Sequence, residues 1–180
     1  MTHLEPSSPA PGAKPLGDLG HPDVQVDDQQ SGHELDLERY RTLAVAVLTS
    51  EGVPEGAALT VLFVSPQVMA DLNAKHMGHE GATDVLAFPI DEHVVDQDLP
   101  ASMPILLGDV VICADVAAAN CVTNKDSYPG HDGSITDEID LLVVHGILHI
   151  LGMDHADDEE RNMMQASERT HLAAFGYEGR

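Results

Sequence analysis

Three histidines, His145, His149 and His155, have the residue type and the spacing to do chemistry together. They lie four and then six residues apart in the stretch LLVVHGILHILGMDH. If the apolar run before Gly152 is helical, His145 and His149 lie one turn apart on one face, and both rings can reach one ion. Gly152 favours the left-handed turn that ends a helix and brings His155 back toward that ion. The pattern predicts a metal site with three nitrogen ligands and one open position.

A second interpretation of these histidines is that they are ordinary core residues. A helix built from Leu, Val and Ile has no packing reason to carry two imidazoles on one face, because each buried ring needs a polar partner. Metal binding is therefore the prediction. The same spacing occurs in zinc peptidases of the metzincin type, in which a glutamate base follows the first histidine, but here that position is Gly146. Without this base, ordinary peptide hydrolysis is disfavoured.

Composition narrows the class of protein. A length of 180 residues with 43% hydrophobic residues fits one globular domain. The net charge of −23 disfavours nucleic-acid binding through a broad basic surface, and DNA is not an expected partner. Two cysteines, Cys113 and Cys121, match neither a zinc ribbon nor a secreted disulfide framework. With no expected membrane segment, we predict a cytoplasmic protein.

The hydrophobic pattern predicts a small α/β (α+β) fold. A proline-rich, disordered tail is expected over residues 1–22, and one metallo-hydrolase domain over residues 23–180. Strands are predicted over 24–26, 58–64, 83–88 and 105–112; helices over 35–48, 66–77, 114–123, 134–151 and 157–175; and an exposed loop over 91–104. This order predicts a mixed sheet of about four strands packed with helices. The metal site would lie at the end of the central helix.

The full string HGILHILGMDH resembles the motif HGxLHLxGYDH of the YbeY-like family, which consists of bacterial metal-dependent endoribonucleases of ribosomal RNA maturation. Two further blocks, TDVLAFP and GDVVI, are similar to the TDVLSFP and GDIVI strands of that family and occur in the same order. The resemblance implies that His145, His149 and His155 hold one zinc ion per chain. It implies a single-strand-specific endoribonuclease for 3′-end maturation of small-subunit rRNA and for ribosome quality control.

Other residues match the family less closely. Asp154 matches the aspartate of the motif, where it orients an imidazole, accepts a proton from water or caps the turn after Gly152. Met77 stands where the best-studied family members carry an arginine that is thought to contact RNA. Arginine can form two parallel hydrogen bonds to a phosphate, and methionine cannot. Lys75 and His76 lie beside this position and are the candidate RNA contacts.

Three functions follow from these observations. The favoured one is a zinc-dependent endoribonuclease with rRNA as substrate, brought to its acidic surface by small-subunit ribosomal proteins or assembly factors, which tend to be basic. The first alternative is a zinc peptidase-like hydrolase, supported by the ligand spacing and opposed by Gly146. The second is a non-catalytic ribosome assembly factor with a structural metal, supported by Met77 and by the acidic composition.

Overall fold

The computed structural model describes residues 20–90 and 105–178. The predicted exposed loop over 91–104 and all but the last three residues of the predicted tail lie outside these ranges. Along the chain lie β1 (Asp23–Asp28), α1 (Leu37–Ser50), β2 (Ala58–Phe63), α2 (Pro66–Met77), β3 (Val85–Pro89), β4 (Leu106–Ile112), α3 (Ala114–Asn120), α4 (Ile135–Ile150) and α5 (Asp158–Glu178). This order agrees with the prediction.

The strands form one mixed sheet in the order β1-β2-β4-β3. β1, β2 and β4 run parallel, while β3 pairs antiparallel with β4, so that Ala87 lies opposite Val110. The two inner strands, β2 and β4, carry almost continuous apolar runs, as strands covered by helices do. The α/β prediction with a sheet of four strands is therefore confirmed.

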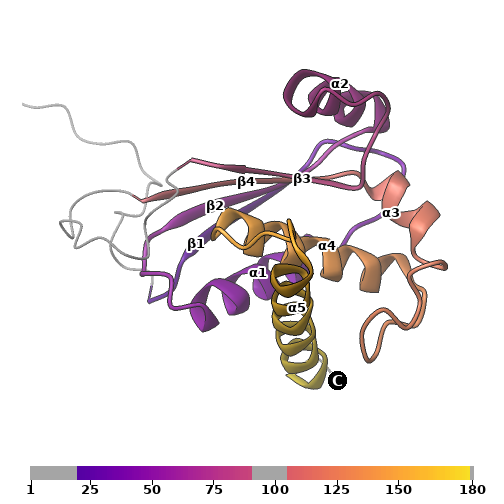
Figure 1. Cartoon of the computed structure of the whole chain (residues 1–180). Helices are drawn as coiled ribbons and strands as arrows, with labels where there is room; N and C mark the ends of the chain where they lie inside the picture. Colours follow the sequence, from indigo (N-terminus) through magenta and orange to yellow (C-terminus); the bar gives the residue numbers. More distant parts are fainter. Residues whose placement is uncertain (1–19, 91–104, 179–180) are drawn as a thin grey trace, which may run out of the picture.

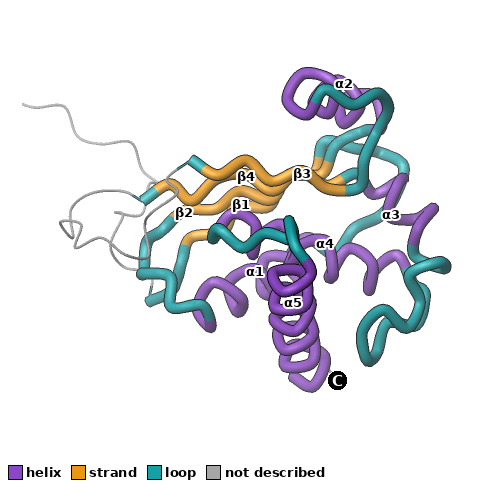
Figure 2. Tube along the Cα trace, in the orientation of Figure 1, coloured by secondary structure: helices purple, strands orange, loops and turns teal. Residues whose placement is uncertain are grey.

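Helices cover the two faces of the sheet unequally. α1 and α4 pack against one face with α5 outside them, and α2 lies on the opposite face (Figure 1). Figure 2 shows the strands as one layer between these two sets of helices. The larger core, between the sheet and α1 and α4, is mainly aliphatic, and Tyr40 and Phe63 are its largest fully buried side chains. The helix that carries His145 and His149 is thus packed against the sheet.

α1, α2 and α4 begin where short polar side chains cap them. Asp36, Ser65 and Ser134 each accept a hydrogen bond from a backbone N–H three residues later, at 3.1, 3.3 and 3.1 Å respectively. Pro66 occupies the first turn of α2, where its missing N–H costs nothing. The caps at Ser65 and Ser134 begin α2 and α4 where the sequence predicts, and α1 begins at Leu37, two residues after the predicted start.

α3 is shorter than expected. The prediction extended this helix to Thr123, but it ends at Asn120 and the chain then turns. The side-chain amide of Asn124 donates to the buried carboxylate of Glu138 on α4 at 2.7 Å. This long-range contact fixes the turn, and no local pattern in the sequence reports it.

Polar contacts fix α1 against both α4 and α5. The guanidinium of Arg39 donates to both carboxylate oxygens of Asp140 on α4 and lies over the ring of Phe175, 5.1 Å from its centroid. At the other end of α1, Nε2 of His171 lies 2.6 Å from Oε1 of Glu51. α5 is therefore held beside α4, where it can contribute to the histidine site.

Candidate metal centre

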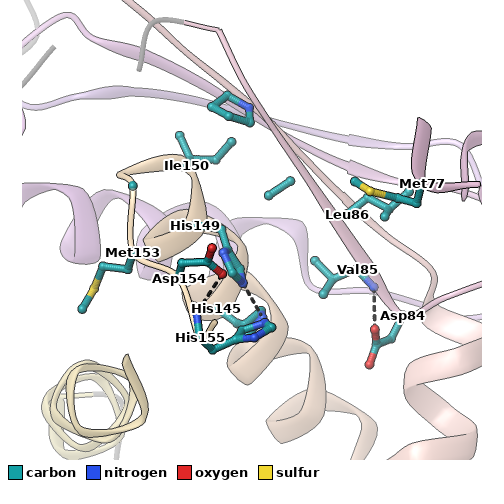
Figure 3. A pocket seen from close by; sticks show the side chains of 13 residues that line it. Met77, Asp84, Val85, Leu86, His145, His149, Ile150, Met153, Asp154 and His155 are labelled. Atoms are coloured by element: carbon teal, nitrogen blue, oxygen red, sulfur yellow. Dashed lines mark hydrogen bonds between the residues drawn. The ribbon is translucent and has the colours of Figure 1, made fainter. Parts of the chain in front are cut away.

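The three predicted ligands meet at one point at the end of α4. His145 and His149 lie one turn apart with their Nε2 atoms 3.1 Å from each other, and His155 approaches from the following turn (Figure 3). One nitrogen from each ring lies within 4.8 Å of the others. Two nitrogens bound tetrahedrally to zinc at ~2.1 Å are ~3.4 Å apart, so this spacing fits a metal ion.

The turn after α4 brings His155 to this point. Gly152 has a φ of +95°, its N–H donates to the carbonyl of His149 at 3.0 Å, and the N–H of Met153 donates to that of Leu148 at 2.9 Å. These two bonds form a Schellman motif, which ends a helix at a residue in the left-handed region. The predicted role of Gly152 is confirmed.

A carboxylate that the sequence analysis missed fixes one ligand. Nδ1 of His145 lies 2.6 Å from Oε1 of Glu168 on α5, a residue only 8% exposed. An ionised carboxylate only accepts, so Nδ1 carries the proton and the lone pair of Nε2 faces the other histidines. The sequence does carry a signal for Glu168. It is an acidic residue four positions from each of Met164 and Leu172, which are buried on the inner face of α5.

The electrostatics of the site suit neutral ligands. Partial burial lowers the pKa of His149, and the neighbouring rings of His145 and His155 lower it further because two positive charges would repel. An imidazole must be neutral to bind a metal. At neutral pH His149 is thus ready to act as a ligand.

A cavity of about 750 Å³ opens beside the histidines. Figure 3 shows the histidines and Asp154 on one side of it, and Val85 and Leu86 of β3 with Met77 on the other. The wall opposite the histidines is therefore largely apolar, and none of the described residues that line this cavity is a lysine or an arginine. The cavity can hold an extended ligand across the metal-binding atoms.

Four residues singled out in the sequence lie around this site in different ways. Asp154 lines the cavity, and its Oδ1 accepts the backbone N–H of His155 at 2.7 Å, which is the turn-capping contact. Lys75 and His76 lie exposed at the end of α2 and do not line the cavity, and the ring of His76 packs 5.0 Å from that of Phe88. Met77 does line it. The roles of Asp154, Lys75 and His76 stay predictions.

The structure also gives the reason for Gly146. A Cβ atom at this position would lie 2.4 Å from Cγ1 of Val110 on β4, far inside van der Waals contact. Position 146 faces the sheet, whereas the histidines on either side face the cavity. A glutamate base therefore has no room here.

Fold and site together define a small α/β protein with a cluster of three histidines that could hold a metal ion at the end of its central helix. The family model described as Endoribonuclease YbeY matches residues 25–176. A protein named Endoribonuclease YbeY from Salinispora tropica is 43% identical over 151 residues, covering 81% of this chain and 92% of the relative. One of the same name from Thermobifida fusca is 43% identical, covering 81% and 90%. The chain therefore belongs to the YbeY endoribonuclease family, whose members are metal-dependent nucleases.

A solved structure supports the fold. The solution structure of TM1509 from Thermotoga maritima has a TM-score of 0.57 to this protein and 23% sequence identity, covering 87% of this chain and 91% of that one. At this identity the likeness concerns the fold alone. Among the described residues, no helix is both long enough and apolar enough to span a membrane.

Proposed function

We propose that this protein is a zinc-dependent endoribonuclease that cleaves single-stranded RNA during 3′-end maturation of small-subunit rRNA and in ribosome quality control. The observation that carries the proposal is the cluster of His145, His149 and His155 beside a cavity, in a chain of the YbeY endoribonuclease family. We further infer that residues 23–180 form one metallo-hydrolase domain and that the protein works in the cytoplasm.

The donor set supports zinc as the resident ion, one per chain. Imidazole nitrogens suit zinc, and three of them leave a coordination position for water or substrate. When bound, zinc supplies a Lewis acid that acidifies water and polarises a phosphoryl oxygen. The three histidines hold the ion, and Glu168 keeps the ring of His145 in the tautomer that can bind it.

The remaining chemistry falls to residues around the cavity. The apolar wall formed by Val85 and Leu86 excludes water from one side of a bound RNA strand. Asp154 is the carboxylate on the cavity wall next to His155, where it can accept a proton from the attacking water. Lys75 and His76 remain candidates for contacts to RNA farther along the strand.

The acidic composition supports a role for partners. With a net charge of −23, the protein repels free RNA at long range. A small-subunit ribosomal protein or assembly factor with a basic surface would bind the acidic protein and bring it to rRNA. Neither DNA nor a membrane is required by this function.

The direct test compares substrates. The zinc-loaded protein is incubated with single-stranded rRNA fragments and with casein, and His149→Ala serves as the blank because it removes one ligand. His79→Ala is the matched control, since His79 is exposed and lines neither cavity near the metal centre. We expect RNA cleavage by the wild type and by His79→Ala only. Cleavage by His149→Ala would indicate a contaminating nuclease, and casein hydrolysis would favour the peptidase alternative.

The non-catalytic alternative has its own support in Met77, which replaces the arginine of the best-studied relatives. If the protein only assists assembly, cells depleted of it accumulate unprocessed rRNA, and expression of the His149→Ala variant restores rRNA processing fully. If it is the nuclease, His149→Ala fails to restore processing while the wild type succeeds.

A further inference from the structure

A second cavity, of about 380 Å³, lies next to the metal centre between α4, α5 and the turn after α3. It shares Asp84, Val85, His145 and His155 with the first cavity. The metal-binding atoms therefore lie where the two cavities meet. A strand whose scissile phosphate lies at the histidines has one neighbouring nucleotide on each side, and each cavity can receive one of them.

The second cavity contains a cation. Arg161, on the first turns of α5, is the only lysine or arginine among the described residues that line either cavity. Its guanidinium contacts Asp158 at 2.8 Å, but both side chains are at least half exposed, so this ion pair is weak and easily exchanged. A guanidinium can bind a phosphate through two parallel hydrogen bonds. Arg161 thus offers the phosphate contact that Met77 cannot make.

A buried network fixes a polar group in the same cavity. The backbone N–H of Gly133 donates to Nδ1 of His131 at 3.1 Å, so the ring proton lies on Nε2. That Nε2–H donates to Oε2 of Glu138 at 2.9 Å, and both side chains are buried. Oε1 of Glu138 then accepts from the amide nitrogen of Asn124 at 2.7 Å.

This network orients the amide of Asn124. Because the carboxylate of Glu138 only accepts, the nitrogen of Asn124 must face it, and Oδ1 is directed away from Glu138. Asn124 is half-buried and lines the cavity, and within the described residues no hydrogen bond to its Oδ1 is formed. The acceptor that Asn124 offers to a ligand is therefore Oδ1. The same wall carries apolar Leu141, Leu142 and Met164. It also carries the carboxylates of Glu138 and Glu168, which are hydrogen-bonded to Asn124 and His131 and to His145 respectively, and the carboxylate of Asp84.

We propose that this second cavity binds the nucleotide next to the scissile phosphate of a single-stranded RNA. Arg161 binds its phosphate, and Oδ1 of Asn124 accepts from the exocyclic amino group of its base. The cavity volume lies in the range of small-ligand sites, and unstacked bases of single-stranded RNA are recognised by hydrogen bonds to their polar edges. The proposal rests on the endoribonuclease function proposed above and adds a preference for the flanking base.

The phosphate contact is tested by binding. A fluorescent single-stranded 2′-O-methyl oligoribonucleotide is titrated with zinc-loaded protein, and anisotropy gives the Kd between about 50 and 200 mM salt. We expect Arg161→Gln to raise the Kd about tenfold, the effect of losing a charged hydrogen-bond pair. It should also lower the slope of log Kd against log salt concentration by about 0.7, the contribution of one phosphate contact on a single strand.

Arg169→Gln is the matched control, because Arg169 is exposed on the same helix and lines neither cavity. It removes the same charge and should change neither the Kd nor the slope by more than the error. If Arg161→Gln behaves like Arg169→Gln while the wild type cleaves RNA, the second cavity is not the subsite and the endoribonuclease function stands. If the wild type neither binds nor cleaves RNA, both proposals fail.

The base contact is tested with two substrates that differ at one group. Cytosine carries an amino group where uracil carries a carbonyl, so oligoribonucleotides with cytidine or uridine on either side of the cleaved bond are compared. We expect kcat/KM to be about fivefold higher with cytidine on one of the two sides, the effect of one neutral hydrogen bond. Asn124→Leu should abolish this preference while the zinc content and Tm show that it folds. Equal rates for wild type on both substrates at both sides would overturn the assignment.

Discussion

Gly146 occupies the position at which zinc peptidases of the metzincin type carry their glutamate base, and it packs against Val110 of β4. The neighbouring His145 and His149 face the cavity instead, so one side of the helix packs on the sheet and the other presents the candidate metal ligands. Glu168 reaches the same site from α5. At the residue scale, the site depends on the close packing of Gly146 on Val110 and on the contact of Glu168 with His145.

The contact of Gly146 predicts a loss of stability in Gly146→Ala. The added Cβ would lie 2.4 Å from Cγ1 of Val110, so α4 must shift. Overpacking of this kind costs about 1–3 kcal/mol, which exceeds the gain of up to about 1 kcal/mol from helix propensity. Urea unfolding measures the difference. Gly176→Ala is the control, because an added Cβ there meets nothing within 4 Å on exposed α5, and it should be neutral or stabilising. A Gly146→Ala protein as stable as the wild type would contradict this packing.

The contact of Glu168 predicts an effect on metal affinity. Glu168→Gln replaces the carboxylate that accepts from His145 and should weaken zinc binding about 10–100-fold, as loss of such partners does. Competition with a chromophoric chelator gives the affinity. Glu160→Gln, on the exposed side of α5, should match the wild type. Equal affinities for all three proteins would show that Glu168 does not position the ligand.

At the element scale, α4 depends on its contacts with the sheet, α1 and α5. The buried Asp140 of α4 is paired with Arg39 of α1, and burial raises the pKa of Asp140 although the guanidinium of Arg39 opposes this. These contacts are satisfied hydrogen bonds between elements distant in sequence. They set the positions of α4 and α5, and through them the metal centre.

Arg39→Met should therefore destabilise the protein in a pH-dependent way. Removing one partner of a buried ion pair costs about 3–5 kcal/mol at neutral pH. The raised pKa of Asp140 in the folded state means that this state holds the proton more tightly than the unfolded state, so stability falls as pH rises through that pKa. The penalty should shrink as pH falls and Asp140 becomes neutral.

Denaturant unfolding at several pH values measures this effect. Arg41→Met is the control, since the pair of Arg41 with Glu38 is exposed and its loss should cost little. A penalty for Arg39→Met that stays constant or grows toward acidic pH would contradict the role of Asp140.

Much of the fold could be predicted from the sequence, because its signals are local. The caps at Asp36, Ser65 and Ser134 and the left-handed turn at Gly152 are set by neighbouring residues. The strand order β1-β2-β4-β3 and the end of α3 depend on contacts between distant segments, and the pattern does not encode them directly.

At the site, too, local signals could be predicted from the sequence and contacts between distant segments could not. The three histidines lie within eleven residues, and their helical spacing already indicates a common ion. Glu168 and Asn124 join the site only because α5 and the turn after α3 pack against α4. Lys75 and His76 are the RNA contacts that the sequence predicts, because they adjoin Met77, yet neither lines the cavities. Arg161 lines the second cavity, and no local pattern in the sequence indicates this.

At the scale of the whole molecule, the net charge of −23 opposes the substrate that the site suits. A partner with a basic surface resolves this conflict by raising the local concentration of rRNA at the cavities. We expect kcat/KM to be at least tenfold higher on immature small-subunit particles than on the same rRNA free in solution. Raising the salt concentration should reduce the difference, because it screens the attraction to the partner. Equal rates on both substrates at low salt would contradict recruitment.

The metal centre underlies every part of this account, and elemental analysis of the purified protein tests it most directly. Inductively coupled plasma mass spectrometry of the wild type and of His149→Ala, prepared without added metal or chelator, gives the zinc content per chain. We expect about one equivalent of zinc in the wild type and a large loss in His149→Ala. A wild-type protein without a transition metal, or the same content in both proteins, would contradict it.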